Sequence, residues 1–109
     1  MLYVDPANAG YQRIAAAYKQ SVGQEPNEML LPLYDAFNVM LHAIQKAGDV
    51  QDTPKVAAAF SKALPMQSIQ GDTLTLGGKS TIGADQQIMT VTYIGAIRDG
   101  QPVVVGKVR

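Results

Sequence analysis

The segment from Leu33 to Phe60 constrains the fold of this chain most, because it contains two helix patterns and the polar loop between them. In the first pattern, apolar residues recur at steps of three and four and share one face, while polar residues share the opposite face. The apolar positions are Leu33, Ala36, Phe37, Met40, Ile44 and Ala47, and the polar positions are Asp35, Asn38, His42, Gln45 and Lys46. The pattern predicts a helix over residues 32–47, with its first face in a core and its second face in water.

Proline and glycine mark the ends of the two helices in this segment. Pro32 suits a first helical turn because its missing N–H would have no partner inside the helix, and Gly48 suits the left-handed residue that follows the last turn. A second helix is predicted over residues 54–64. It begins at Pro54 with Asp52 or Thr53 as the capping side chain, and the next proline prevents its continuation.

An upstream helix is predicted over residues 11–22. Its apolar stripe again has helical spacing and consists of Tyr11, Ile14, Ala15, Tyr18 and Val22. The chain enters this helix through Asp5-Pro6 or Asn8 and leaves it at Gly23. Three helices therefore occupy the first 64 residues.

After these helices the apolar period changes to two, which is typical of strands. Leu74 and Leu76 alternate with threonines, and residues 88–97 are rich in Ile, Val, Thr and Tyr, with Met89, Val91, Tyr93 and Ile97 expected on one side. Asp99-Gly100 tolerates the positive φ angles of a two-residue hairpin turn, and Pro102 begins the returning strand. The predicted fold class is α/β, with three helices followed by a short strand and a C-terminal β-hairpin.

Composition excludes several classes of function. Nine basic and nine acidic residues balance, and no cluster of Lys or Arg forms the positive surface that nucleic acid requires. No apolar stretch is long enough for a membrane span, and the N-terminus lacks the basic and apolar segments of a secretory signal. Cysteine is absent, so no disulfide forms.

The residues that could carry catalysis have simpler explanations. Gly78-Lys79-Ser80 resembles the end of a phosphate-binding loop, but Thr73 replaces the earlier glycine and no helix start is expected after it. His42 has no Cys or carboxylate three or four residues later, so it is predicted to be a solvated surface residue. No nucleophile and base can be paired. The chain is therefore predicted to be no enzyme and to hold no metal or cofactor.

The order of these elements resembles the last third of a periplasmic solute-binding protein of an ABC transporter, in the type I branch that serves branched-chain and related amino acids. Four landmarks carry the resemblance: the AYKQSVGQEP run that ends at Pro26, the Tyr34-Asp35-Ala36 helix start, Gly71 before a short strand, and Asp99-Gly100 in the last hairpin. The landmarks span nearly the whole chain.

The resemblance implies a fragment of a two-lobed receptor. Residues 1–87 resemble the last segment of the first lobe, and residues 88–109 resemble a crossover strand and the hairpin at the tail of the second lobe. Such a receptor binds its solute between the lobes in the periplasm and delivers it to a membrane permease. Faces left uncovered would be hidden by the missing segments or by self-association, so we expect a homo-oligomer when the chain is alone.

By the same resemblance, Tyr34, Asp35 and Tyr3 are the candidate ligand-binding residues. Each has a second interpretation: Tyr34 could pack at the helix start, the helix dipole alone could stabilise Asp35, and Tyr3 lies only near the expected hinge crossing. An alternative function is also open, namely an autonomous, self-associating interaction module that binds no ligand.

Overall fold

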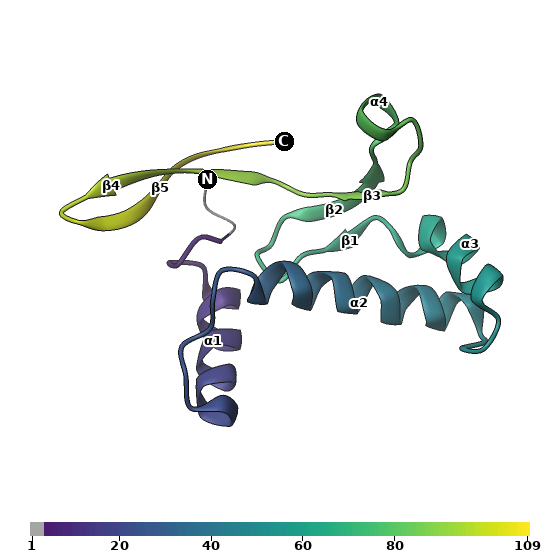
Figure 1. Cartoon of the computed structure of the whole chain (residues 1–109), viewed down its shortest axis with the longest axis horizontal. Coiled ribbons are helices and arrows are strands. Elements are labelled where there is room, and N and C mark those ends of the chain that lie inside the picture. Colours follow the sequence, from purple (N-terminus) through teal and green to yellow (C-terminus); the bar gives the residue numbers. More distant parts are fainter. Residues whose placement is uncertain (1–3) are drawn as a thin grey trace.

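A computed structural model describes residues 4–109, so the candidate Tyr3 lies outside the described part (Figure 1). The elements in chain order are α1 (Ala9–Val22), α2 (Leu30–Ala47), α3 (Thr53–Ala63), β1 (Met66–Gln67), β2 (Thr73–Gly77), α4 (Lys79–Ile82), β3 (Gln87–Met89), β4 (Thr92–Arg98) and β5 (Gln101–Val108). The predicted α/β fold, with three long helices before a closing hairpin, is confirmed. The two-residue strand β1 and the one-turn helix α4 were not anticipated.

Side-chain caps and glycines set the helix ends largely as predicted. The Asn8 side chain accepts a hydrogen bond from Tyr11 N at 3.1 Å at the start of α1, and Asp52 accepts one from Lys55 N at 3.1 Å at the start of α3. Gly23 and Gly48 adopt left-handed φ angles of 79° and 70° after α1 and α2.

Two antiparallel sheets follow the helices. β1, β2 and β3 form one sheet, with β2 in the centre, and β4 pairs with β5 in the other. The hairpin turn has φ angles of 51° at Asp99 and 75° at Gly100, as the dipeptide predicts. The strand-like run over residues 88–97 is divided between the two sheets, because the β2–β3 ladder stops after Met89 and Thr92 begins pairing with the separate strand β5.

The core lies between α2, α3 and the first sheet. Val39, Leu64 and Leu74 form one buried cluster, against which Phe60 and other partly buried side chains pack. A second cluster consists of Ala43, Ala59 and Ala63, whose small side chains belong to α2 and α3. The first cluster fixes the position of the first sheet over α2, and the second joins α2 to α3.

The buried face of α2 is not the face that the sequence pattern indicates. The inner face consists of Leu31, Asp35, Val39 and Ala43, which lie at steps of four and are all buried. Most of the predicted core face is open: Leu33, Phe37 and Met40 are 63%, 55% and 41% exposed. Together with Leu41, which is 41% exposed, they form what we call the outer face. The expectation fails because α2 carries a second apolar stripe of Leu31, Val39 and Ala43, and this stripe, which also contains Asp35, is the one that is buried.

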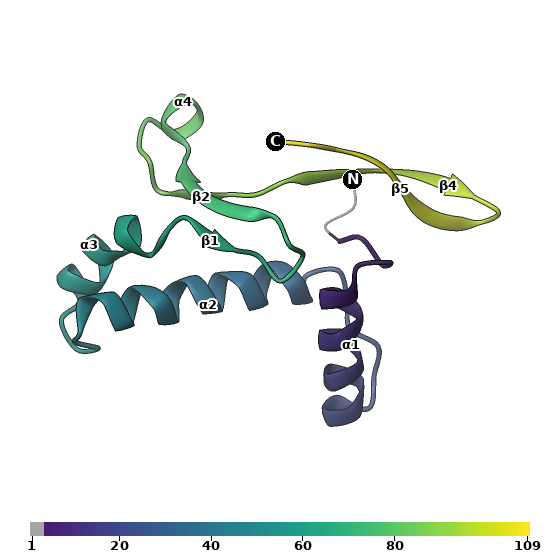
Figure 2. The same ribbon diagram turned by 180° about the vertical axis from the view of Figure 1, so that it is seen from behind.

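The described chain is extended. Its Cα radius of gyration is 15.9 Å, whereas a compact domain of this length would have about 13 Å. Its accessible surface is 7382 Å², against about 5,800 Å² for a compact monomer of the same mass. The view from behind shows the reason: α1 points away from α2, and the β4–β5 hairpin extends past the end of α2 that is far from α3 (Figure 2).

Candidate functional site

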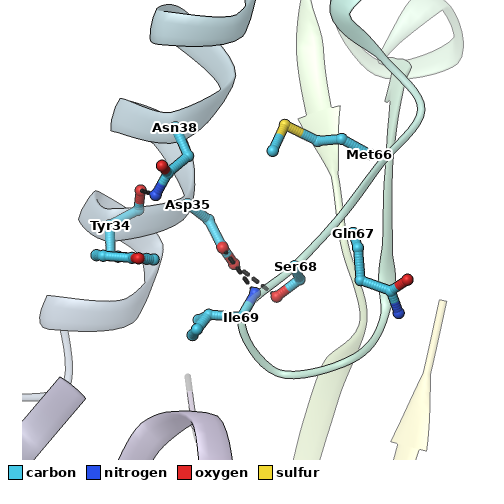
Figure 3. A pocket seen from close by; sticks show the side chains of 7 residues that line it. All are labelled: Tyr34, Asp35, Asn38, Met66, Gln67, Ser68 and Ile69. Atoms are coloured by element: carbon cyan, nitrogen blue, oxygen red, sulfur yellow. Dashed lines mark hydrogen bonds between the residues drawn. The ribbon is translucent and has the colours of Figure 1, made fainter. Parts of the chain in front are cut away.

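An open pocket of about 240 Å³ lies between the first half of α2 and the turn that follows β1 (Figure 3). The helix supplies Tyr34, Asp35 and Asn38 to its wall, and the strand and turn supply Met66, Gln67, Ser68 and Ile69. The pocket therefore brings together two of the candidate residues that the sequence suggested. Its wall combines apolar groups, amides and one carboxylate.

Asp35 is the charged residue of this pocket, and it is only 9% exposed. Its Oδ2 accepts a hydrogen bond of 2.6 Å from Ser68 Oγ, and its Oδ1 accepts one of 2.9 Å from Ile69 N (Figure 3). Because α2 begins at Leu30, Asp35 lies beyond the first turn, where the helix dipole has little effect. The charge of this carboxylate is therefore balanced by donors from the turn, and the oxygens keep further lone pairs.

Residues 68–72 form the turn that receives Asp35, and we call them the 68–72 turn. Ser68 N donates to Asp72 O at 2.7 Å, Gly71 N donates to Ser68 O at 3.0 Å, and Gln70 N donates to Ser68 Oγ at 3.0 Å. Gly71 has a φ of 87°, which a residue with a side chain rarely adopts. The turn thus holds the Ser68 hydroxyl between Asp35 and its own backbone.

Tyr34 and Asn38 occupy successive turns of α2 beside Asp35. Asn38 Nδ2 donates to the backbone oxygen of Tyr34 at 2.8 Å, and both residues are half-buried. For Asn38 one sequence signal existed, namely its position one helical turn after Tyr34. Ser68 had no such signal, because its contact with Asp35 joins positions 33 residues apart.

Two other candidate residues differ from their predictions. His42 is half-buried and its Nδ1 lies 3.1 Å from Ala63 O, so the prediction of a solvated histidine is wrong. Because a carbonyl only accepts, Nδ1 carries the proton there. The expectation of no helix start after Gly78 is also wrong, since α4 begins at Lys79. The first amide of α4 is nevertheless already bonded, because Lys79 N donates to Asp85 Oδ1 at 3.3 Å. Within residues 4–109 no three His, Cys, Asp or Glu side chains are grouped as metal ligands would be.

A second polar cluster joins the 68–72 turn to the hairpin. Tyr93 Oη donates to Asp72 Oδ2 at 2.9 Å, and Lys107 Nζ donates to Asp72 Oδ1 at 3.1 Å. Burial raises the pKa of the Tyr93 phenol well above its usual range, and the hydrogen bond to Asp72 and the negative charges of Asp72 and Asp5 raise it further. The phenol is therefore a permanent donor to Asp72.

Comparison with known families identifies the class of protein. The model of the periplasmic binding protein family matches residues 2–102, which is nearly the whole chain, and the chain belongs to that family. Its members bind solutes and are not enzymes, and the resemblance seen in the sequence is confirmed at this level. Nothing among curated proteins or solved structures matches the chain. No helix in the described residues has the length and apolar character that crossing a membrane requires.

Proposed function

We propose that this chain is the C-terminal part of a periplasmic receptor for an ABC importer of branched-chain or related amino acids. The observation that carries the proposal is the family match over residues 2–102. In this function the receptor captures the amino acid between two lobes and delivers it to a membrane permease. The open outer face of α2 supports the proposal, because the rest of the first lobe would cover it.

We assign residues 1–87 to the first lobe and residues 88–109 to the crossing and the second lobe. The separation of the two sheets supports this division, since the chain passes from β3 to β4 through residues 90 and 91 alone. Lobes of such a receptor are joined by a few extended crossings, and a short link between two independent sheets has that form.

The pocket beside α2 is the proposed solute contact of the first lobe. The Tyr34 ring and the apolar side chains of Met66 and Ile69 suit an aliphatic group, and the remaining lone pairs of Asp35 suit an ammonium group. Tyr3 belongs to the proposal on the resemblance alone. Because the pocket is open on one side, the chain by itself should bind amino acids only weakly.

Amide chemical shifts of the labelled chain would test this site. With leucine, isoleucine or valine at millimolar concentration, the expected result is saturable shifts at residues 34–38 and 66–69. Tyr34→Ala should abolish these shifts, whereas Tyr18→Ala, which alters a half-buried tyrosine on α1, should leave them unchanged. Shifts that appear elsewhere, or that survive in Tyr34→Ala, would contradict the proposed pocket.

The alternative function is that of a self-associating interaction module without a ligand. The exposed outer face of α2 favours it, because a face of this kind is often buried between copies of a chain. Light-scattering mass alone cannot separate the two functions, since both predict an oligomer for the isolated chain. A stable oligomer combined with no amino-acid response at the pocket would favour the module.

A further inference from the structure

The 68–72 turn is bonded on three sides to segments that are distant in the sequence. We infer that this turn is the joint that fixes the β4–β5 hairpin relative to the helices, with Asp35 and Asp72 as its positioning residues. Asp35 holds one end of the turn to α2, and Asp72 holds the other end to the hairpin. Neither role requires a bound solute.

The helix side of the joint is buried, and each oxygen of its carboxylate has a hydrogen-bond donor. Asp35 and Ser68 are 9% and 4% exposed, and the carboxylate accepts from both the Ser68 hydroxyl and the Ile69 amide. Removal of the carboxylate would leave both donors without their partner in a place that water hardly reaches, which is costly. The turn would then relax away from α2.

Helix α1 packs closely against the same turn. A Cβ on Gly10 would lie 2.0 Å from Ile69 O, so the helix backbone is as close to the turn as glycine permits. Asn8, which caps α1, also donates its Nδ2 to Gln70 O at 3.0 Å. The turn thus lies between two helices, and it cannot move closer to α1.

The hairpin side of the joint is polar. The hydrogen bonds that connect β4, β5 and the C-terminal residue to the other described elements all end on Asp72 or Thr73. They come from Tyr93 Oη at 2.9 Å and Lys107 Nζ at 3.1 Å to Asp72, and from the Arg109 guanidinium to Thr73 O. A shift of the turn therefore displaces the acceptors to which the hairpin is hydrogen-bonded.

The same turn forms one wall of the pocket, which links this inference to the proposed function. Ser68 and Ile69 line the pocket, and Asp72 is only three residues further along. On the basis of that proposed function, a solute that contacts Asp35 or Ser68 changes the bonds that hold the turn, and the hairpin responds. The inference that the turn positions the hairpin does not depend on this solute response.

Amide hydrogen exchange in the ligand-free chain tests the joint. In Asp35→Ala, exchange in β4 and β5 should accelerate about tenfold more than exchange in α2 and α3, because the hairpin loses a fixed attachment while the α2–α3 amides respond only to the general loss of stability. Asp35→Asn should restore most of the protection, since its carbonyl can accept from Ile69 and its NH₂ can donate to Ser68 Oγ. Asn38→Ala is the matched control, because Asn38 bonds only within α2 and should leave the hairpin unchanged.

Two results would overturn the inference. One is unchanged hairpin exchange in Asp35→Ala while the amides of the 68–72 turn accelerate. The other is uniform acceleration over the whole chain in both Asp35→Ala and the milder Ser68→Ala, which would indicate general destabilisation. If amino acids cause no shifts at the pocket but the exchange pattern is found, the proposed function fails and the joint remains.

Discussion

The two faces of α2 differ in what covers them, although both are apolar. On the inner face, Leu31 and Val39 are 1% and 0% exposed, and Val39 packs with Leu64 after α3 and with Leu74 of the first sheet. On the outer face, Leu33 and Phe37 are more than half exposed. A helix that is apolar on both sides belongs between two layers, and the described residues supply one of them.

The largest effect should come from the core behind the inner face. Leu74→Ala removes a side chain that is 2% exposed and packs with Val39 and Leu64, so the free energy of unfolding should fall by about 3 kcal/mol. Urea unfolding followed by circular dichroism would measure it. Leu41→Ala, on the outer face, is the matched control and should change the free energy of unfolding by no more than about 0.5 kcal/mol. Equal losses would show that the outer face is also packed.

The polar centre of the inner face should have the next largest effect. Asp35→Ala leaves the Ser68 hydroxyl and the Ile69 amide unpaired, so we expect a loss of about 2 kcal/mol in the free energy of unfolding. Glu28→Ala removes an exposed carboxylate just before the same helix and should change stability by less than about 0.5 kcal/mol. If both substitutions have the same effect, the turn does not depend on Asp35.

The contact of the turn with the hairpin should respond to alkaline pH. Because the pKa of Tyr93 is raised in the folded state, the unfolded chain releases this proton first, near pH 10, and stability falls as pH increases further. Tyr93→Phe should lower the free energy of unfolding by about 1 kcal/mol at neutral pH, because the hydrogen bond to Asp72 is lost. Above pH about 10 the stability of this variant should fall less steeply with pH than that of the original chain.

Urea unfolding at several alkaline pH values would compare this variant with the original chain. Tyr18→Phe is the control, because Tyr18 lies on α1 far from Asp72 in the sequence, and it should keep the original alkaline slope. A Tyr93→Phe variant with an unchanged slope would contradict the assignment of this alkaline effect to Tyr93.

The smallest change in stability should come from the outer face itself. Leu33→Gln combined with Phe37→Gln replaces two exposed apolar side chains, so the free energy of unfolding should change by less than about 1 kcal/mol. If the isolated chain associates through this face, the mass from light scattering should nevertheless fall, because the surface has become polar. Ile97→Gln is the comparison on another surface, because Ile97 lies near the tip of the hairpin and is also more than half exposed. An unchanged mass after both outer-face substitutions would place self-association elsewhere.

Local chemistry made much of this fold predictable. Asn8 and Asp52 cap helices, Gly23 and Gly48 end them, and Asp99-Gly100 turns the hairpin, because each depends on residues only a few positions away. Tyr34 and Asp35 became candidates through the family resemblance instead, and both line the same pocket.

Long-range packing accounts for what the sequence did not reveal. Periodicity showed that α2 has an apolar face, but it could not decide which of two apolar stripes meets the sheet, and Leu31, Val39 and Ala43 were the overlooked signal. Ser68 and Asp72 could not be recognised either, because their partners Asp35, Tyr93 and Lys107 lie between 21 and 35 positions away.

The flat shape of the chain has a thermodynamic consequence. Its Cα extents are 50 × 37 × 19 Å, so it is about two layers of backbone thick and buries little apolar area for its length. The steepness of a melting transition is set by the enthalpy of unfolding, which increases with the amount of packed structure that is lost. The isolated chain should therefore melt over a broader temperature range than a compact domain of 109 residues, and any covering layer should sharpen that transition.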